Sequence, residues 1–233
     1  GTIQSIQRGG LLQAKFDALF LAMGAMAVYG VVLAGWSSNS NYSLLGGLRS
    51  GAQMISYELA MGFSVAGVML MAGSMSLVDV VDGQAGNFWD WYWIPQIVGG
   101  VIFFIASIAE LNRTPFDLAE AEQEIVAGYL TEYSGMRWGM FYFAEYVNLI
   151  VVSMIVSTLY LGGWRAPFES WNVIPGPIWL FLKVCFLIFL YMWIRWTLIR
   201  YRYNQLMSVG WKVLLPLSIA NLVVTAIVVS VVG

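Results

Sequence analysis

Six stretches of this chain are each long and apolar enough to cross a lipid bilayer, because a spanning helix needs roughly 20 predominantly apolar residues. Runs such as LFLAMGAMAVYGVVLAGW are apolar throughout, whereas the strands of a membrane barrel alternate polar and apolar residues. The sequence therefore predicts an all-α polytopic protein of about six transmembrane helices, with residues 1–233 as a single membrane domain. The expected spans are residues 17–36, 52–76, 93–110, 138–161, 177–199 and 211–232.

The residue content restricts what chemistry the chain can carry out alone. Hydrophobic residues make up 60% of it and charged residues 10%, against about 25% charged residues in an ordinary soluble domain. There is no histidine, and the single cysteine, Cys185, lies inside an apolar stretch. Haem and iron–sulfur clusters use histidine, cysteine or methionine sets that are lacking here. We expect no metal site on this chain, so any electron transfer falls to a partner.

Lysine and arginine residues orient the predicted bundle, because they concentrate on the cytoplasmic side of membrane proteins. If the six spans alternate, the loops near 37–51, 111–137 and 195–212 share one side and carry seven of these residues, against three on the other side. This places the loop over 111–137 on the cytoplasmic, matrix or stromal side. Pro216 lies within the last span and predicts a kink there.

An acidic stretch, AELNRTPFDLAEAEQEIVAGYLTE, runs from Ala109 to Glu132 and contains six of the thirteen acidic residues. Pro115 is suited to the start of a new helix. Asp117, Glu120 and Glu124 then recur at i, i+3 and i+7, which puts them on one helical face. Like charges on one face repel, so we expect them to be neutralised by protons, cations or arginines such as Arg113 and Arg49. The prediction is an amphipathic acidic loop.

Glu58, Glu145 and Lys183 are charged residues in the interior of predicted spans. Charged groups in the bilayer are costly and are usually functional or paired. Lys183 has no acidic residue in its own span, so a carboxylate such as Glu145 or Glu58 is its expected partner. Arg195 lies at the end of the same span, where snorkelling and a role beside a binding site are both open. Together these residues suggest titratable groups leading from the loop into the membrane.

The acidic stretch and its continuation, TEYSGMRWGMFYFAEY, closely resemble the signature of the quinone-site membrane subunit of respiratory complex I. This subunit is called H in bacteria and 1 in mitochondria. The segment GGLRSGAQMISYELAMG resembles another part of the family, and RWTLIRYRYNQLMSVGWKVLLPLSIANL resembles its last loop and helix. The resemblance covers approximately residues 17–225.

The resemblance implies a chain that walls the cavity where quinone, its substrate, is reduced by an iron–sulfur subunit of the peripheral arm. It also implies antiporter-like membrane subunits as partners, and a proton-translocating NADH:quinone oxidoreductase in which this chain holds no catalytic residue of its own. The residues matched to the quinone cavity and acidic loop are Arg49, Glu110, Arg113, Asp117, Glu120, Glu122, Glu124 and Arg195. Those matched to the proton path are Glu58, Glu132, Glu145 and Lys183.

The chain departs from the family pattern at Ile199, where the family has proline, and at Asn204, where it has aspartate. The family's first two membrane helices also have no counterpart here, so we expect a fragment or a second chain. A homologous subunit of a membrane-bound hydrogenase or ferredoxin-linked complex is the alternative. An independent ion transporter is disfavoured because no internal repeat is visible. We expect the bacterial plasma membrane, with the mitochondrial inner membrane or the thylakoid as alternatives.

Overall fold

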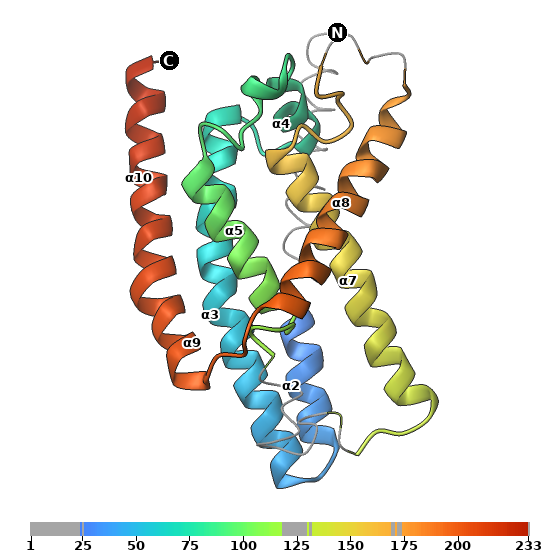
Figure 1. Ribbon diagram of the computed structural model, residues 1–233. Helices are drawn as coiled ribbons and strands as arrows, with labels where there is room; N and C mark the ends of the chain where they lie inside the picture. The colour runs from blue at the N-terminus through green and yellow to red at the C-terminus, as the bar shows by residue number, and fades with distance from the viewer. Residues whose placement is uncertain are drawn as a thin grey trace, which may run out of the picture.

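The computed structural model describes residues 24, 26–117, 130, 132–168, 171 and 174–232. The regular secondary structure in these residues is helical, and no strand occurs among them. Four helices are long and apolar enough to cross a membrane, the longest being α3 (Asn41–Ala72). They stand side by side in a bundle (Figure 1). The expected class, an all-α polytopic membrane protein, is confirmed.

The other helices that could span are α7 (Met136–Tyr160), α8 (Gly176–Thr197) and the continuous helix over Tyr203–Val231. That last helix comprises α9 (Tyr203–Val209), a π-helical turn (Gly210–Leu214) and α10 (Leu215–Val232). The shorter elements are α2 (Ala27–Ser37), α4 (Leu77–Gly83), a 3₁₀ turn (Phe88–Asp90) and α5 (Ile97–Glu110).

The predicted spans over 17–36 and 93–110 correspond to α2 and α5, which are shorter apolar helices of 11 and 14 residues. Part of the first span lies outside the described residues. Two helices begin earlier than the predicted spans. Helix α3 begins at Asn41 rather than near 52, and the last helix begins at Tyr203 rather than near 211. Arg49 consequently lies on a helix and not in a loop.

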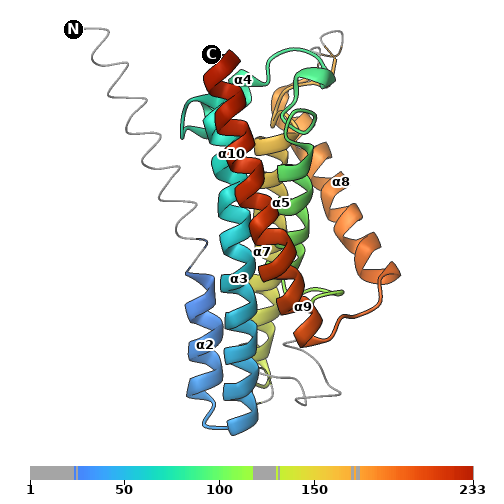
Figure 2. The ribbon, with the colours of Figure 1, turned by 90° about the vertical axis from the view of Figure 1, so that its left-hand side faces the viewer.

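Helix α3 begins early because its first turns pack closely on α2, and the two helices lie together in both views (Figures 1 and 2). A side chain on Gly35 would come within 2.7 Å of the Ser43 carbonyl oxygen, and one on Gly47 within 3.2 Å of the Gly35 Cα atom. Small residues allow membrane helices to approach in this way. Backbone proximity thus holds a polar, glycine-rich segment in helical form.

The π-helical turn lies directly before Pro216. Proline lacks an N–H and its ring crowds the preceding turn of a helix, so a local change of helical geometry accommodates it. The perturbation expected at Pro216 therefore takes the form of a widened turn, and the helix continues through it to Val232.

The segments expected on one side of the membrane meet at one end of the bundle, which we call the charged end because it holds Arg113, Glu145 and Arg195. Here the Ser37 hydroxyl lies 2.8 Å from the hydroxyl of Tyr133. The Tyr201 N–H donates to the Pro115 carbonyl over 3.1 Å. These contacts bring segments of the three loops together, as expected if the spans alternate, while the six-span topology and the side of the membrane that this end faces remain predictions.

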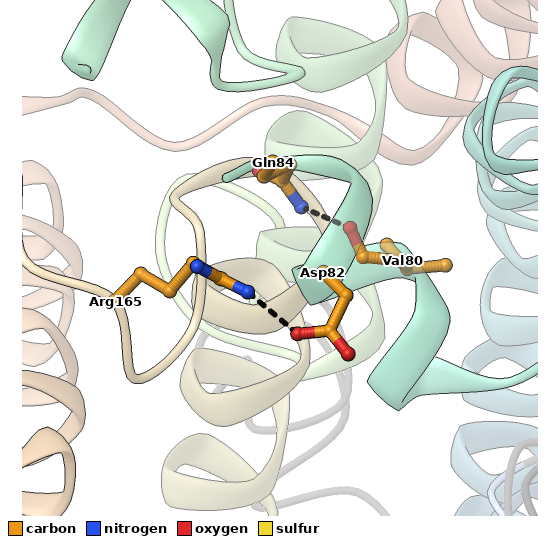
Figure 3. Close-up of polar contacts among 4 residues, drawn as sticks. All are labelled: Val80, Asp82, Gln84 and Arg165. Atoms are coloured by element: carbon orange, nitrogen blue, oxygen red, sulfur yellow. Dashed lines mark hydrogen bonds and ion pairs between the residues drawn. The ribbon is translucent and has the colours of Figure 1, made fainter. Parts of the chain in front are cut away.

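The opposite end, which holds α4 and the start of α8, is joined by amide side chains. The fully buried Gln84 donates through Nε2 to the carbonyls of Val80, Thr158 and Leu159. Beside it Arg165 pairs with Asp82 at 2.7 Å (Figure 3). This ion pair is substantially exposed, and exposed pairs stabilise a fold by only about 0–1 kcal/mol. The buried amide is the stronger link.

Candidate functional site at the charged end

The centre of the charged end is an ion pair between Arg113 and Glu145. Arg113 Nε lies 2.6 Å from Glu145 Oε1, and the guanidinium carbon is 4.6 Å from the ring centroid of Tyr146. Arg113 is only 6% exposed, whereas the Glu145 side chain is 25% exposed. The loop after α5 and the middle of α7 therefore supply opposite charges that neutralise one another in a mostly buried place.

Two further charged residues, Arg195 and Asp117, lie close enough to act electrostatically on Glu145. Arg195 ends α8 and is exposed, and Asp117 is partly buried. Arg195 favours the ionised form of Glu145, and Asp117 opposes it. The structure thus brings together Arg113, Asp117, Glu145 and Arg195, from three different elements, and these four residues form the candidate site.

The Arg113 side chain is carried by the loop Leu111–Asp117, which has an irregular backbone. Asn112 adopts a left-handed conformation with φ of 49°, and the peptide bond before Pro115 is cis. Phe116 packs between Tyr57 and Tyr201, with ring centroids 5.6 and 5.9 Å away. The loop is therefore in contact both with α3 and with the segment after α8.

Deeper in the membrane domain, Glu58 on α3 and Glu110 at the end of α5 are close enough to interact electrostatically. Both are partly buried. Glu110 Oε2 is buried and accepts no hydrogen bond from the described residues. Nearby, the hydroxyls of Ser107 and Tyr191 are 2.7 Å apart, and Tyr191 also interacts electrostatically with Glu110. Glu58, expected on the proton path, thus lies with Glu110 in one group of carboxylates, and Glu145, also expected on that path, lies with Asp117 in another.

Among the described residues, Lys183 pairs with neither Glu145 nor Glu58 nor any other carboxylate. Its Nζ donates to three backbone carbonyls, those of Leu161, Gly163 and Arg165, over 2.5, 3.0 and 2.7 Å. It also lies 4.2 Å from the ring centroid of Trp91. These partners are at the opposite end of the bundle. The prediction was wrong because carbonyl acceptors exist at every residue and leave no trace in a sequence.

The remaining predicted residues are distributed as follows. Arg49 lies on α3, with its guanidinium carbon 5.6 Å from the ring centroid of Tyr203. Glu132 is exposed at the far side of the acidic loop. Glu120, Glu122 and Glu124 lie outside the described residues, so their predicted shared face stays a prediction.

Sequence reasoning missed Gln53, whose side chain is fully buried beside the site. Its Nε2 donates over 2.9 Å to the carbonyls of both Ala109 and Phe116. Ser50, one turn earlier, donates to Asn112 Oδ1 over 3.3 Å. The sequence feature that could have identified Gln53 is its amide side chain within an apolar run. Such a polar group requires a hydrogen-bond partner in a bilayer.

A comparison with known protein families relates nearly the whole sequence to one family. The sequence model described as NADH dehydrogenase matches residues 11–226 of the chain. The match extends over all the described helices up to most of α10, and it includes every residue of the candidate site. The chain therefore belongs to the NADH dehydrogenase family, as a membrane subunit of the complex I type.

Proposed function

We propose that the charged end walls the cavity in which a quinone is reduced, and that it transmits the resulting charge change to carboxylates deeper in the membrane. The observation that supports this most is the Arg113–Glu145 ion pair, 2.6 Å long, with Arg195 and Asp117 beside it. Two arginines provide hydrogen-bond donors for the carbonyl oxygens of a quinone head group. Family membership supports the same assignment.

The residue types of this chain indicate that the electrons come from another subunit. With no histidine and a single cysteine, exposed on α8, the chain depends on a partner for the two electrons that convert a quinone to a quinol. An iron–sulfur subunit of the peripheral arm is the proposed donor. Two protons must also reach the quinone oxygens. The contribution of this chain is to position the head group and to respond to its charge.

The proposed response begins at Glu145. Negative charge developing on the quinone attracts Arg113 and Arg195, which weakens their hold on Glu145 and changes its affinity for protons. Glu110 and Glu58 lie deeper and interact with one another, so they are the next carboxylates in the proposed relay. Antiporter-like membrane subunits would receive the change. Lys183 has no part in this path, because its partners lie at the opposite end.

A photoreactive quinone analogue tests the location. In native membranes containing the assembled complex, we expect the head group to label the peptides that contain Arg113 and Arg195, and excess unlabelled quinone to prevent the labelling. The peptide that contains Gln84 and Trp91 is the internal control, since it belongs to the opposite end of the same chain. Labelling confined to that control peptide, or labelling that excess quinone does not reduce, would refute the proposed cavity.

The acidic loop is tested by Glu120→Gln and Glu124→Gln, each of which removes one charge with little change in volume. If the loop carries the response, each variant should lower quinone reductase activity several-fold in a complex that still assembles, because a coupled set of carboxylates loses a titratable member. Initial rates are divided by the amount of assembled complex. Full activity and full proton pumping in both variants would remove the loop from the mechanism.

A further inference from the structure

Besides the Ser50–Asn112 hydrogen bond and the contact of Phe116 with Tyr57, the amide side chain of Gln53 ties the Leu111–Asp117 loop to α3. Gln53 is completely buried, and its Nε2 donates over 2.9 Å both to the Ala109 carbonyl and to the Phe116 carbonyl. These two carbonyls lie on either side of Arg113 in the sequence. A single nitrogen therefore joins the last turn of α5 to the end of the loop, and Arg113 lies on the segment between them.

The orientation of this amide is determined by its partners. Both of its contacts are carbonyl oxygens, which accept hydrogen bonds, so the atom facing them must be the N–H₂ group. The other atom, Oε1, is buried without a hydrogen bond to the described residues. An ionised carboxylate in the same place would face two acceptors and donate to neither. The position therefore requires a donor with two N–H groups, which among uncharged side chains of this length is glutamine.

Other hydrogen bonds of the loop show how the Gln53 amide helps to locate Arg113. Within the loop, the Phe116 N–H donates to the Arg113 carbonyl over 2.8 Å, which closes a turn around the residue. Tyr201 holds the Pro115 carbonyl from the side of α8. Gln53 binds the loop from the side of α3. The backbone around Arg113 is therefore held by hydrogen bonds from Gln53 and from Tyr201. The Arg113 guanidinium then reaches Glu145 at 2.6 Å.

We infer that Gln53 is a positioning residue of the quinone site, which fixes the Arg113 guanidinium by tying both ends of its loop to α3. This inference rests on the function proposed above. A small displacement of a positioned group can change a rate or an affinity strongly. Loss of the amide should therefore affect quinone recognition through Arg113, even though Gln53 is buried beneath the loop.

The test compares Gln53→Met with Gln84→Met in the assembled complex. Both glutamines are fully buried and donate to backbone carbonyls, but Gln84 lies at the opposite end, so the pair separates positioning from general loss of a buried hydrogen bond. We expect Gln53→Met to raise the KM for a short-chain quinone roughly tenfold and Gln84→Met to leave it unchanged. Equal KM values in the two variants would overturn the inference.

Two additional variants complete the design. In a Glu145→Gln background, Gln53→Met should change KM by less than about threefold, because coupled residues are not additive; an undiminished tenfold effect would show that Gln53 does not act through the ion pair. If the complex with Gln53→Met does not assemble, the KM of Gln53→Glu tests the inference instead. A protonated carboxyl can donate to one of the two carbonyls, so its KM should lie between the wild-type value and the tenfold increase expected for Gln53→Met. Failure of both to assemble, with Gln84→Met intact, would reject positioning in favour of folding.

The outcome for the inference can be separated from that for the proposed function. If Glu145→Gln alone leaves the KM and the rate unchanged, the proposed quinone site is wrong, whatever Gln53 does. If Glu145→Gln has its effect and Gln53→Met behaves like Gln84→Met, the site stands and only the positioning role fails.

Discussion

Glu145→Gln is expected to lower quinone reductase activity per assembled complex by roughly ten- to a hundredfold. Breaking a buried ion pair by removing one partner costs about 3–5 kcal/mol, and the side chain of Glu145 is 25% exposed, so a smaller figure of about 1.5–3 kcal/mol applies here. Arg113, which is 6% exposed, keeps its charge without its partner. It must reorient, and the head group then loses its positioned donor.

Asp90→Asn is the matched control, because it also replaces a carboxylate by an amide, and Asp90 is exposed at the opposite end of the bundle. It should retain full activity. Arg113→Lys is a second informative change, since it preserves the charge but loses the planar guanidinium with its five N–H groups. We expect activity between that of the wild type and that of Glu145→Gln. Quinone reductase rates are measured over a range of quinone concentrations. Equal rates for Glu145→Gln and Asp90→Asn would contradict the proposed site.

Much of the fold could be predicted from apolar runs, because the bilayer requires long helices wherever the chain crosses it. The predicted span begins later than the helix where tertiary contact, and not hydrophobicity, is the reason for helix formation. The first turns of α3, NYSLLGGLRS, contain asparagine, serine and glycine, and by composition they favour a loop. They are helical because Gly47 allows close contact with α2. No property of the segment by itself carries that information.

The candidate site was predictable to the extent that its members are side chains of opposite charge. Arg113 and Glu145 could be selected as candidate site residues from their type and from the family resemblance, and Arg113 was expected to neutralise acidic residues. Their mutual pairing was not predicted. Lys183, which lies inside a span, was expected to pair with a carboxylate, whereas its partners among the described residues are backbone carbonyls. Partners that belong to the backbone, as for Lys183 and Gln53, cannot be located before the fold is known.

Lys183→Met is expected to reduce the amount of assembled complex several-fold while leaving the activity of each assembled complex unchanged. The Nζ group satisfies the carbonyls of Leu161, Gly163 and Arg165 in the connection between α7 and α8. Methionine fills a similar volume and donates no hydrogen bond. A buried acceptor left without a donor costs about 1–3 kcal/mol, and a loss of about 1–2 kcal/mol is enough to change abundance several-fold.

Lys212→Met is the control for Lys183→Met. It makes the same lysine-to-methionine replacement at a residue that is exposed on the last helix. Its complex should accumulate like the wild type. The two measurements are the quantity of intact complex after native gel separation and the quinone-dependent proton pumping divided by that quantity. A lysine that carries protons would lose pumping per complex when replaced by methionine, whereas one that only closes the α7–α8 connection would lose quantity alone. Normal accumulation of Lys183→Met, or loss of pumping in the complexes that do form, would therefore return Lys183 to the proton path.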